Sequence, residues 1–236
     1  MFLRSNLPQM NGSPTIVERE QLTLSNVQID SWLLHADEVA LEPILRSVLA
    51  KYAWRRPESI ELARTAYERM YLREDVLGRP LYLGVASSPP LCALIVSREP
   101  RIGIELVSPR DAERLLPTIE DAIGAQERDL LAGLSPGARR RALLSIWTRK
   151  RALQQANAVV ELTPLQTIAV GLGELALELP ASFGWSDRWR VHGFTMRSGE
   201  IGSIAVYNHE QLLILGAGDR RTGMKKGTFA GSERRR

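Results

Sequence analysis

The sequence is poor in the residue types that build disulfides and zinc sites. Its 236 residues include one cysteine and three histidines. A lone thiol excludes a disulfide within the chain, and the histidines lack metal-ligand spacing, so structural zinc clusters are excluded as well. Cys92 lies in the apolar run 91–96, which predicts a buried and inert thiol. This cysteine usage is typical of a reducing compartment, and we expect a cytoplasmic protein.

Long apolar stretches are also missing. No segment approaches the ~20 apolar residues that a membrane span needs, and residues 1–14 lack the apolar core of a signal peptide. The net charge of +4 comes from residues 217–236, which hold seven basic and two acidic side chains. This segment is more typical of a disordered tail than of a nucleic-acid site. We therefore expect neither a membrane nor a nucleic acid as partner.

Apolar periodicity in the first half predicts a helix followed by strands. The helix runs from Asp37 to about Trp54, with Pro43 in its first turn, where proline is tolerated. The other elements expected in this half are one or two strands over 22–34, a helical or mixed segment over 57–71, and strands over 81–86, 91–97 and 101–107.

The second half repeats this order of elements. Ser135 followed by Pro136 is a helix-start signal. The repeated order predicts an α+β protein of two pseudo-symmetric lobes, each with helices on a small antiparallel sheet. We expect helices over 110–123 and 136–157, and strands near 166–179, 188–196 and 201–207. We expect four regions: an arm (1–20), an N-terminal lobe (21–100), a C-terminal lobe (101–216) and a basic tail (217–236).

One strand and one helix place charged side chains on apolar elements. On the strand 101–107, side chains alternate, so Glu105 shares a face with Gly103 and Val107. On the helix 136–157, Lys150 falls inside the apolar stripe that includes Trp147. A lysine there needs an anion or an exit to solvent.

These two elements resemble motifs of a known family. The strand reads Gly-Ile-Glu at 103–105, and the helix reads Trp-Thr-Arg-Lys at 147–150, with the segment 125–132 between them. This order is similar to that of the larger, two-lobed 4′-phosphopantetheinyl transferases, over residues 22–215. The resemblance implies the two-lobed fold of that family, a monomer, coenzyme A between the lobes, and a magnesium ion on three carboxylates. It also implies transfer of phosphopantetheine to a serine of an acyl or peptidyl carrier protein.

The residues at the metal positions differ from the family pattern. The first acid is Glu105, where the family has aspartate; the second position holds Val107 and the third holds Arg151. The summed charge of the three rises from −3 to 0. At an effective dielectric constant of ~20, each charge ~4 Å from an ion is worth roughly 4 kcal/mol before solvation is discounted. We therefore expect no bound magnesium.

Other family positions are partly kept. By the resemblance, Arg79, Ser87, Ser88 and Lys150 contact coenzyme A or the phosphopantetheine arm. Candidate catalytic residues are Glu105, Glu127, Lys150 and Arg151, with Glu127 at the place of a candidate general base. A lysine of the family helix falls on Gln155, and its phosphate-contacting histidine falls on Ser88.

Plainer interpretations stand beside these. Trp147 on a helical stripe is typical of core, and Glu127 in a first turn is by default a solvated acid. Arg151 either replaces the charge of the lost metal or is a surface residue. Residues 139–141, three arginines, are either the wet face of a helix or a docking site for an acidic carrier protein.

Three functions remain open. In the preferred hypothesis, the chain keeps the fold and acts on carrier-bound intermediates of polyketide, nonribosomal or fatty-acid type without magnesium-dependent transfer. Glu105 or Glu127 then serves as acid or base. In the second, the chain is an active phosphopantetheinyl transferase. In the third, it is a non-catalytic partner of a carrier protein.

Overall fold

A computed structural model describes most of the chain between residues 28 and 216. The expected arm (1–20) and basic tail (217–236) lie outside the described residues. So do residues 172–178 of the expected strand near 166–179. The described ranges are 28–35, 41–64, 70–157, 164–171, 179, 183, 188–196, 198–207 and 213–216.

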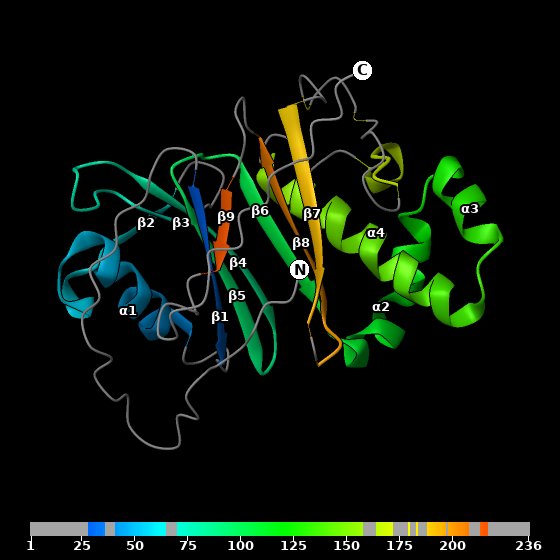
Figure 1. The fold of residues 1–236 in the computed structure, drawn as a ribbon, viewed down its shortest axis with the longest axis horizontal. Helices are drawn as coiled ribbons and strands as arrows, with labels where there is room; N and C mark the ends of the chain where they lie inside the picture. The colour runs from blue at the N-terminus through cyan, green and yellow to red at the C-terminus, as the bar shows by residue number, and fades with distance from the viewer. Residues whose placement is uncertain are drawn as a thin grey trace.

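Two β-sheets lie face to face between helices (Figure 1). The larger sheet has the strand order β2-β3-β4-β5-β1-β9, and the smaller has the order β6-β8-β7. The larger sheet consists of β1 (Gln28–His35), β2 (Leu62–Arg64), β3 (Met70–Leu72), β4 (Leu81–Ser88), β5 (Leu91–Ser97) and β9 (Leu213–Gly216), and the smaller of β6 (Ile102–Val107), β7 (Trp189–Thr195) and β8 (Ile201–Tyr207).

The helices cover the outer faces of the two sheets. Helix α1 (Leu41–Ala53) packs on the larger sheet, and α4 (Pro136–Ala156) packs on the smaller one, with two shorter helices beside it (Figure 1). The order of layers is therefore helix, sheet, sheet, helix. The remaining helical elements are α2 (Pro109–Asp121), α3 (Ala125–Ala132) and the single 3-10 turns η2 (Pro57–Ser59) and η4 (Leu165–Thr167).

The central strand β5 shows how the layers are joined. All seven of its residues are buried, because β5 has a strand on each side and a layer on each face. Leu94 and Val96 pack towards α1, and Ala93 and Ile95 pack towards the smaller sheet. Cys92 lies in this strand fully buried, as its apolar neighbours predict, and burial raises the pKa of its thiol to about 11.

Strand β6 joins the two sheets and α4. Ile102, Ile104 and Leu106 pack against the larger sheet, so the alternate side chains face α4, as expected. A Cβ atom at Gly103 would lie 2.1 Å from the carbonyl oxygen of Ala152. Only glycine permits this approach of α4 to β6, and the approach brings the helix over Glu105.

Most of the expected elements are confirmed. The α+β class, the helices near 110–123 and 136–157, and the strands near 188–196 and 201–207 are present within a few residues. The segment 57–71 is mixed, the second of the two expected alternatives, because the single turn η2 is followed by the short strands β2 and β3.

Strand β9 adds one feature that the sequence pattern does not indicate. It pairs with β1 in parallel, whereas the other pairs of both sheets are antiparallel. Residues from the expected C-terminal lobe thus extend the sheet of the N-terminal one. No helix in the described ranges is long and apolar enough to cross a membrane.

Candidate functional site

Glu105 and Gln155 form the polar contact between β6 and α4. Gln155 Nε2 donates to Glu105 Oε2 at 2.8 Å, and Gln155 Oε1 accepts from the Ile104 N–H at 3.2 Å. Because the backbone N–H is a donor, it fixes which end of the amide faces Glu105. The carboxylate is therefore held in place by a side chain from the helix.

The surroundings of Glu105 change the pKa of its carboxyl group. Burial raises the pKa of its carboxyl, and the positive charge of Arg151 opposes the shift without cancelling it. The side chain is half-buried. A carboxyl of this kind is closer to exchanging protons near neutral pH than an ordinary surface acid.

Arg151 lies on α4 close to this carboxylate. Its guanidinium carbon is 5.8 Å from the centre of the Trp147 ring, and its Nη1 donates to Gln154 Oε1. The side chain is half-buried. The cation therefore lies against an aromatic face near Glu105, so it is placed to offset negative charge at this position.

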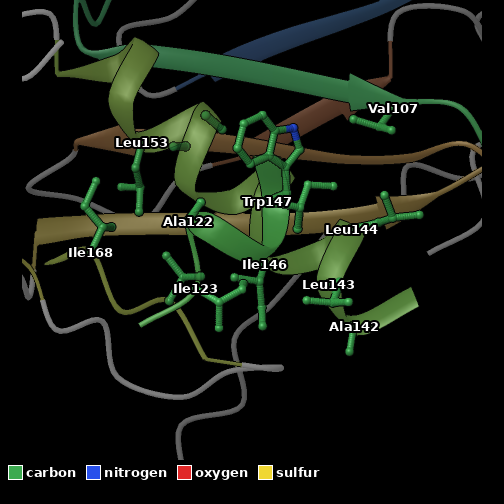
Figure 2. Close-up of a cluster of buried hydrophobic side chains, with 14 of the residues drawn as sticks. Val107, Ala122, Ile123, Ala142, Leu143, Leu144, Ile146, Trp147, Leu153 and Ile168 are labelled. Atoms are coloured by element: carbon green, nitrogen blue, oxygen red, sulfur yellow. The ribbon is translucent and has the colours of Figure 1, made fainter. Parts of the chain in front are cut away.

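Val107 lies in the apolar cluster under α4. It is 3 % exposed and belongs to the same cluster as Trp147, which is buried as its helical position predicts (Figure 2). The other members drawn with labels in the figure are Ala122, Ile123, Ala142, Leu143, Leu144, Ile146, Leu153 and Ile168.

The residues present do not fit a magnesium ion. Mg²⁺ needs several oxygen ligands, usually one or two carboxylates with phosphate oxygens and water. Here Glu105 is joined by a buried valine and a cation, and within the described ranges no three His, Cys, Asp or Glu side chains lie close enough to hold a metal.

The second pair of predicted residues, Glu127 and Lys150, forms an ion pair inside the protein. Lys150 Nζ lies 2.5 Å from Glu127 Oε2, and the side chains are 0 % and 1 % exposed. Lys150 Nζ also donates to the carbonyl oxygens of Ala122 at 2.7 Å and Leu165 at 2.9 Å. These three acceptors match the three N–H donors of an ammonium group. Desolvation lowers the pKa of Lys150, and Glu127 opposes that shift.

Both carboxylate oxygens of Glu127 also have hydrogen-bond partners inside the protein. Its Oε2 accepts from the Gly124 N–H at 3.0 Å, and its Oε1 accepts from the Val170 N–H at 3.2 Å. The default interpretation of Glu127 as a solvated first-turn acid is therefore wrong. Its carboxylate caps the first turn of α3 and neutralises Lys150, so both residues connect parts of the fold. The anion that Lys150 needs is this carboxylate.

The residues expected to contact coenzyme A are not gathered in one place. Arg79 precedes β4 and is exposed, whereas Ser87 and Ser88 end it. At ~3.3 Å per residue, the eight-residue strand separates them by roughly 25 Å. Ser88 is buried and donates to Asp111 Oδ2 at 3.3 Å, which joins the end of β4 to α2. Ser87 is exposed.

A row of small and polar residues continues from Glu105 across the smaller sheet. Ser203 pairs with Glu105 on one side and with Gly193 on the other. The hydroxyl oxygens of Ser203 and Thr148 are 2.9 Å apart. The buried Arg149 donates to the carbonyl oxygens of Val170 and Gly171. This side of the α4 interface is therefore polar, in contrast to the cluster around Trp147.

Two partners of the site were not anticipated. Gln155 stands out in the sequence only as the place of a lost lysine, yet it orients Glu105. Asp111 accepts from both Ser88 and Ser108. The sequence feature that could have identified Asp111 is Ser-Pro-Arg-Asp at 108–111. It is a typical helix start, in which Ser108 accepts from the Asp111 N–H.

No protein-family model matches the chain, and no curated protein matches it at a significant level. The resemblance to phosphopantetheinyl transferases therefore rests on the strand and helix motifs.

Proposed function

We propose that the chain is a two-lobed, phosphopantetheinyl transferase-like protein that acts on carrier-protein-bound intermediates without magnesium-dependent transfer. The observation that carries this proposal is the trio Glu105, Val107 and Arg151. Two of its three metal positions hold a buried apolar residue and a cation. The strand and helix that present the trio keep the close packing through Gly103. A scaffold retained around an altered site is typical of a changed function.

Arg151 supplies the charge that the phosphopantetheine arm needs. The arm joins its carrier serine through a phosphodiester, which carries one negative charge. A guanidinium has five N–H donors in a planar fork that matches phosphate oxygens, and Arg151 is half-buried against Trp147, where its charge is less screened than at an open surface. Arg151 carries one positive charge and the phosphodiester carries one negative charge, so binding of the arm does not require a divalent ion.

Glu105 is the acid or base of the proposal. It is half-buried, its pKa is raised, and Gln155 holds one oxygen in a fixed direction. Glu127 is unsuited to this role because both of its oxygens accept internal hydrogen bonds and its charge is paired with Lys150. The reaction class is a proton transfer on the tethered acyl chain.

Intact-mass spectrometry tests this function directly. Apo carrier proteins are incubated with the protein, coenzyme A and magnesium, beside the same carriers in holo and acyl-loaded form. We expect no phosphopantetheine gain on apo carriers, and a complex or a changed acyl chain with the loaded ones. Deuterium uptake from D₂O detects a proton transfer that leaves the mass in H₂O unchanged. A phosphopantetheine gain that the wild type produces and Glu105→Gln abolishes would make the protein a transferase and overturn the proposal.

The hydrogen bond from Gln155 supports a second candidate, a non-catalytic partner of the carrier protein. A carboxylate that accepts from a half-buried amide is stabilised as part of the fold. Deuterium uptake separates the two candidates. A stable complex with holo carrier and no uptake indicates the non-catalytic partner. Uptake that Glu105→Gln abolishes and Glu120→Gln, at an exposed glutamate, leaves intact indicates the enzyme.

A further inference from the structure

Two adjacent glutamines of α4 each bind one charged group of the candidate site. Gln154 Oε1 accepts a hydrogen bond from Arg151 Nη1, and Gln155 Nε2 donates to Glu105 Oε2 at 2.8 Å. Residues 151, 154 and 155 are neighbours on the helix surface, because they are three and four positions apart. The guanidinium and the carboxylate therefore each have one amide partner, and the two amides are consecutive in the chain.

Glu105 and Arg151 interact electrostatically without forming an ion pair. Burial raises the pKa of the Glu105 carboxyl and the positive charge of Arg151 lowers it, so the two groups lie near each other. The ion pairs between residues that the structure describes do not include this one. A carboxylate and a guanidinium that meet form strong and often bidentate hydrogen bonds. The separation of the two groups therefore needs a physical cause.

The two amides provide that cause. Gln154 supplies an acceptor that occupies a donor of the guanidinium, and Gln155 supplies a donor that occupies an acceptor of the carboxylate. The amide of Gln155 is fixed in this direction, because its Oε1 accepts from the Ile104 N–H at 3.2 Å. Hydrogen bonds to charged groups are stronger than those between neutral groups, so each amide competes with a direct ion pair.

The outer atoms of the two charged groups are open. Glu105 Oε1 and Arg151 Nη2 have no hydrogen-bond partner among the residues that the structure describes, and neither atom is buried from solvent. Both side chains are half-buried. A ligand can therefore meet a carboxylate oxygen and a guanidinium nitrogen at one place. In a closed ion pair, these same atoms would bind each other.

We propose that Gln154 and Gln155 are positioning residues that keep Glu105 and Arg151 apart, so that both charged groups stay available to a ligand. The ligand is the phosphopantetheine arm of the proposed function, and to that extent the inference rests on that function. In a closed pair, the charge of Arg151 would be neutralised before it met the phosphate. Glu105 would also be a weaker base, because the ion pair would stabilise its carboxylate.

A double-mutant cycle tests the positioning role without any ligand. Glu105→Gln, Arg151→Gln and their combination are unfolded in urea at pH 8, in the wild-type background and in Gln154→Ala/Gln155→Ala. In the wild type, the two effects on the unfolding equilibrium constant should multiply to within about twofold. Without the amides the pair closes, and the coupling should reach about fivefold. Each cycle is measured within its own background, so stability lost through the alanines cancels.

Two further backgrounds complete the cycle. Gln154→Ala alone releases only Arg151, and it gives an intermediate coupling in a protein that keeps the contact between Gln155 and Glu105. Gln126→Ala, at an exposed glutamine of α3, is the matched control and should keep the wild-type coupling. Equal coupling with and without Gln154 and Gln155 would overturn the proposal.

Calorimetry with 4′-phosphopantetheine separates the positioning role from the proposed function. The wild type and Gln126→Ala should bind it, and Gln154→Ala/Gln155→Ala should bind about fivefold more weakly, because Arg151 must first leave Glu105. Increased coupling with no binding by the wild type would keep the positioning role and remove the proposed function. Equal coupling with binding by the wild type would overturn the positioning role and leave the function standing. Increased coupling with unchanged binding would also overturn it, since the closed pair would not hinder the ligand.

Discussion

Lys150 and Glu127 form a buried ion pair that joins three separate segments. Lys150 projects from α4 and Glu127 from α3, and the pair also bonds to the backbone at Ala122, Leu165 and Val170. A buried pair contributes little net stability compared with apolar residues of the same size, but removing one partner leaves an uncompensated charge. The pair therefore specifies how the α2–α3 turn and residues 164–171 sit on α4.

Replacing Lys150 by methionine is expected to destabilise the protein by about 3–5 kcal/mol, because the buried Glu127 carboxylate loses its counter-ion. The free energy of unfolding is measured in urea at neutral pH. Arg139→Met, on an exposed part of the same helix, is the control and changes stability by no more than ~0.5 kcal/mol. Equal unfolding midpoints for the two variants would show that the pair is solvated in solution.

Gly103 provides a test of the α4–β6 contact. A Cβ atom there would meet the backbone of α4 at Ala152 and Ala156, so Gly103→Ala forces the helix away from the strand. We expect a loss of about 3 kcal/mol in unfolding free energy. Gly137→Ala lies in α4 with nothing within 4 Å of the added Cβ, and it is neutral or stabilising by up to about 1 kcal/mol. The pair of variants separates a steric effect from helix propensity.

The sequence predicts the helices and strands better than it predicts which side chains meet at the candidate site. Alternation on β6 places Glu105 towards α4, and helical periodicity identifies Lys150 as a charge that needs a partner; both are local patterns. The identity of that partner is not local. Glu127 meets Lys150 of α4 and the Val170 N–H, which come 23 and 43 residues further along the chain. Likewise, a one-turn helix and two three-residue strands in 57–72 are too short for periodicity to distinguish.

The titration of Glu105 gives a prediction with a defined sign. Its pKa is raised in the folded state, so the folded protein holds this proton more tightly than the unfolded chain. The contribution is fully present below the ordinary carboxyl pKa and is lost as pH rises through the raised value. Compared with Glu105→Gln, the wild type should therefore lose stability from acid towards neutral pH and then level off.

Urea unfolding of both proteins between pH 4 and 8 measures this difference. Arg151→Ala removes the charge that lowers the pKa of Glu105, so the pH range over which the wild type loses stability should move to higher pH. A wild type that gains stability over Glu105→Gln as pH rises would mean that attraction to Arg151 outweighs burial.

Placing carboxylates where the resembled family has them should create a metal site that the native residues do not form. Val107→Glu/Arg151→Glu places two further acids beside Glu105, one at a buried position and one in place of the cation. Without metal, we expect this variant to be less stable than the wild type, since a buried carboxylate lacks a partner. Binding of Mg²⁺ to the folded state alone stabilises it by about 2.7 kcal/mol when free metal is 100-fold above Kd.

Thermal unfolding with and without magnesium gives the measurement. The Tm of the variant should rise with magnesium concentration, whereas Val107→Gln/Arg151→Gln, which adds side chains of the same size without charge, should not respond. The wild type should not respond either, because its Glu105 faces a cation and a buried valine instead of two more carboxylates. Tight magnesium binding by the wild type in calorimetry would contradict the proposal that Arg151 takes the place of a metal, and would favour a metal-dependent transferase.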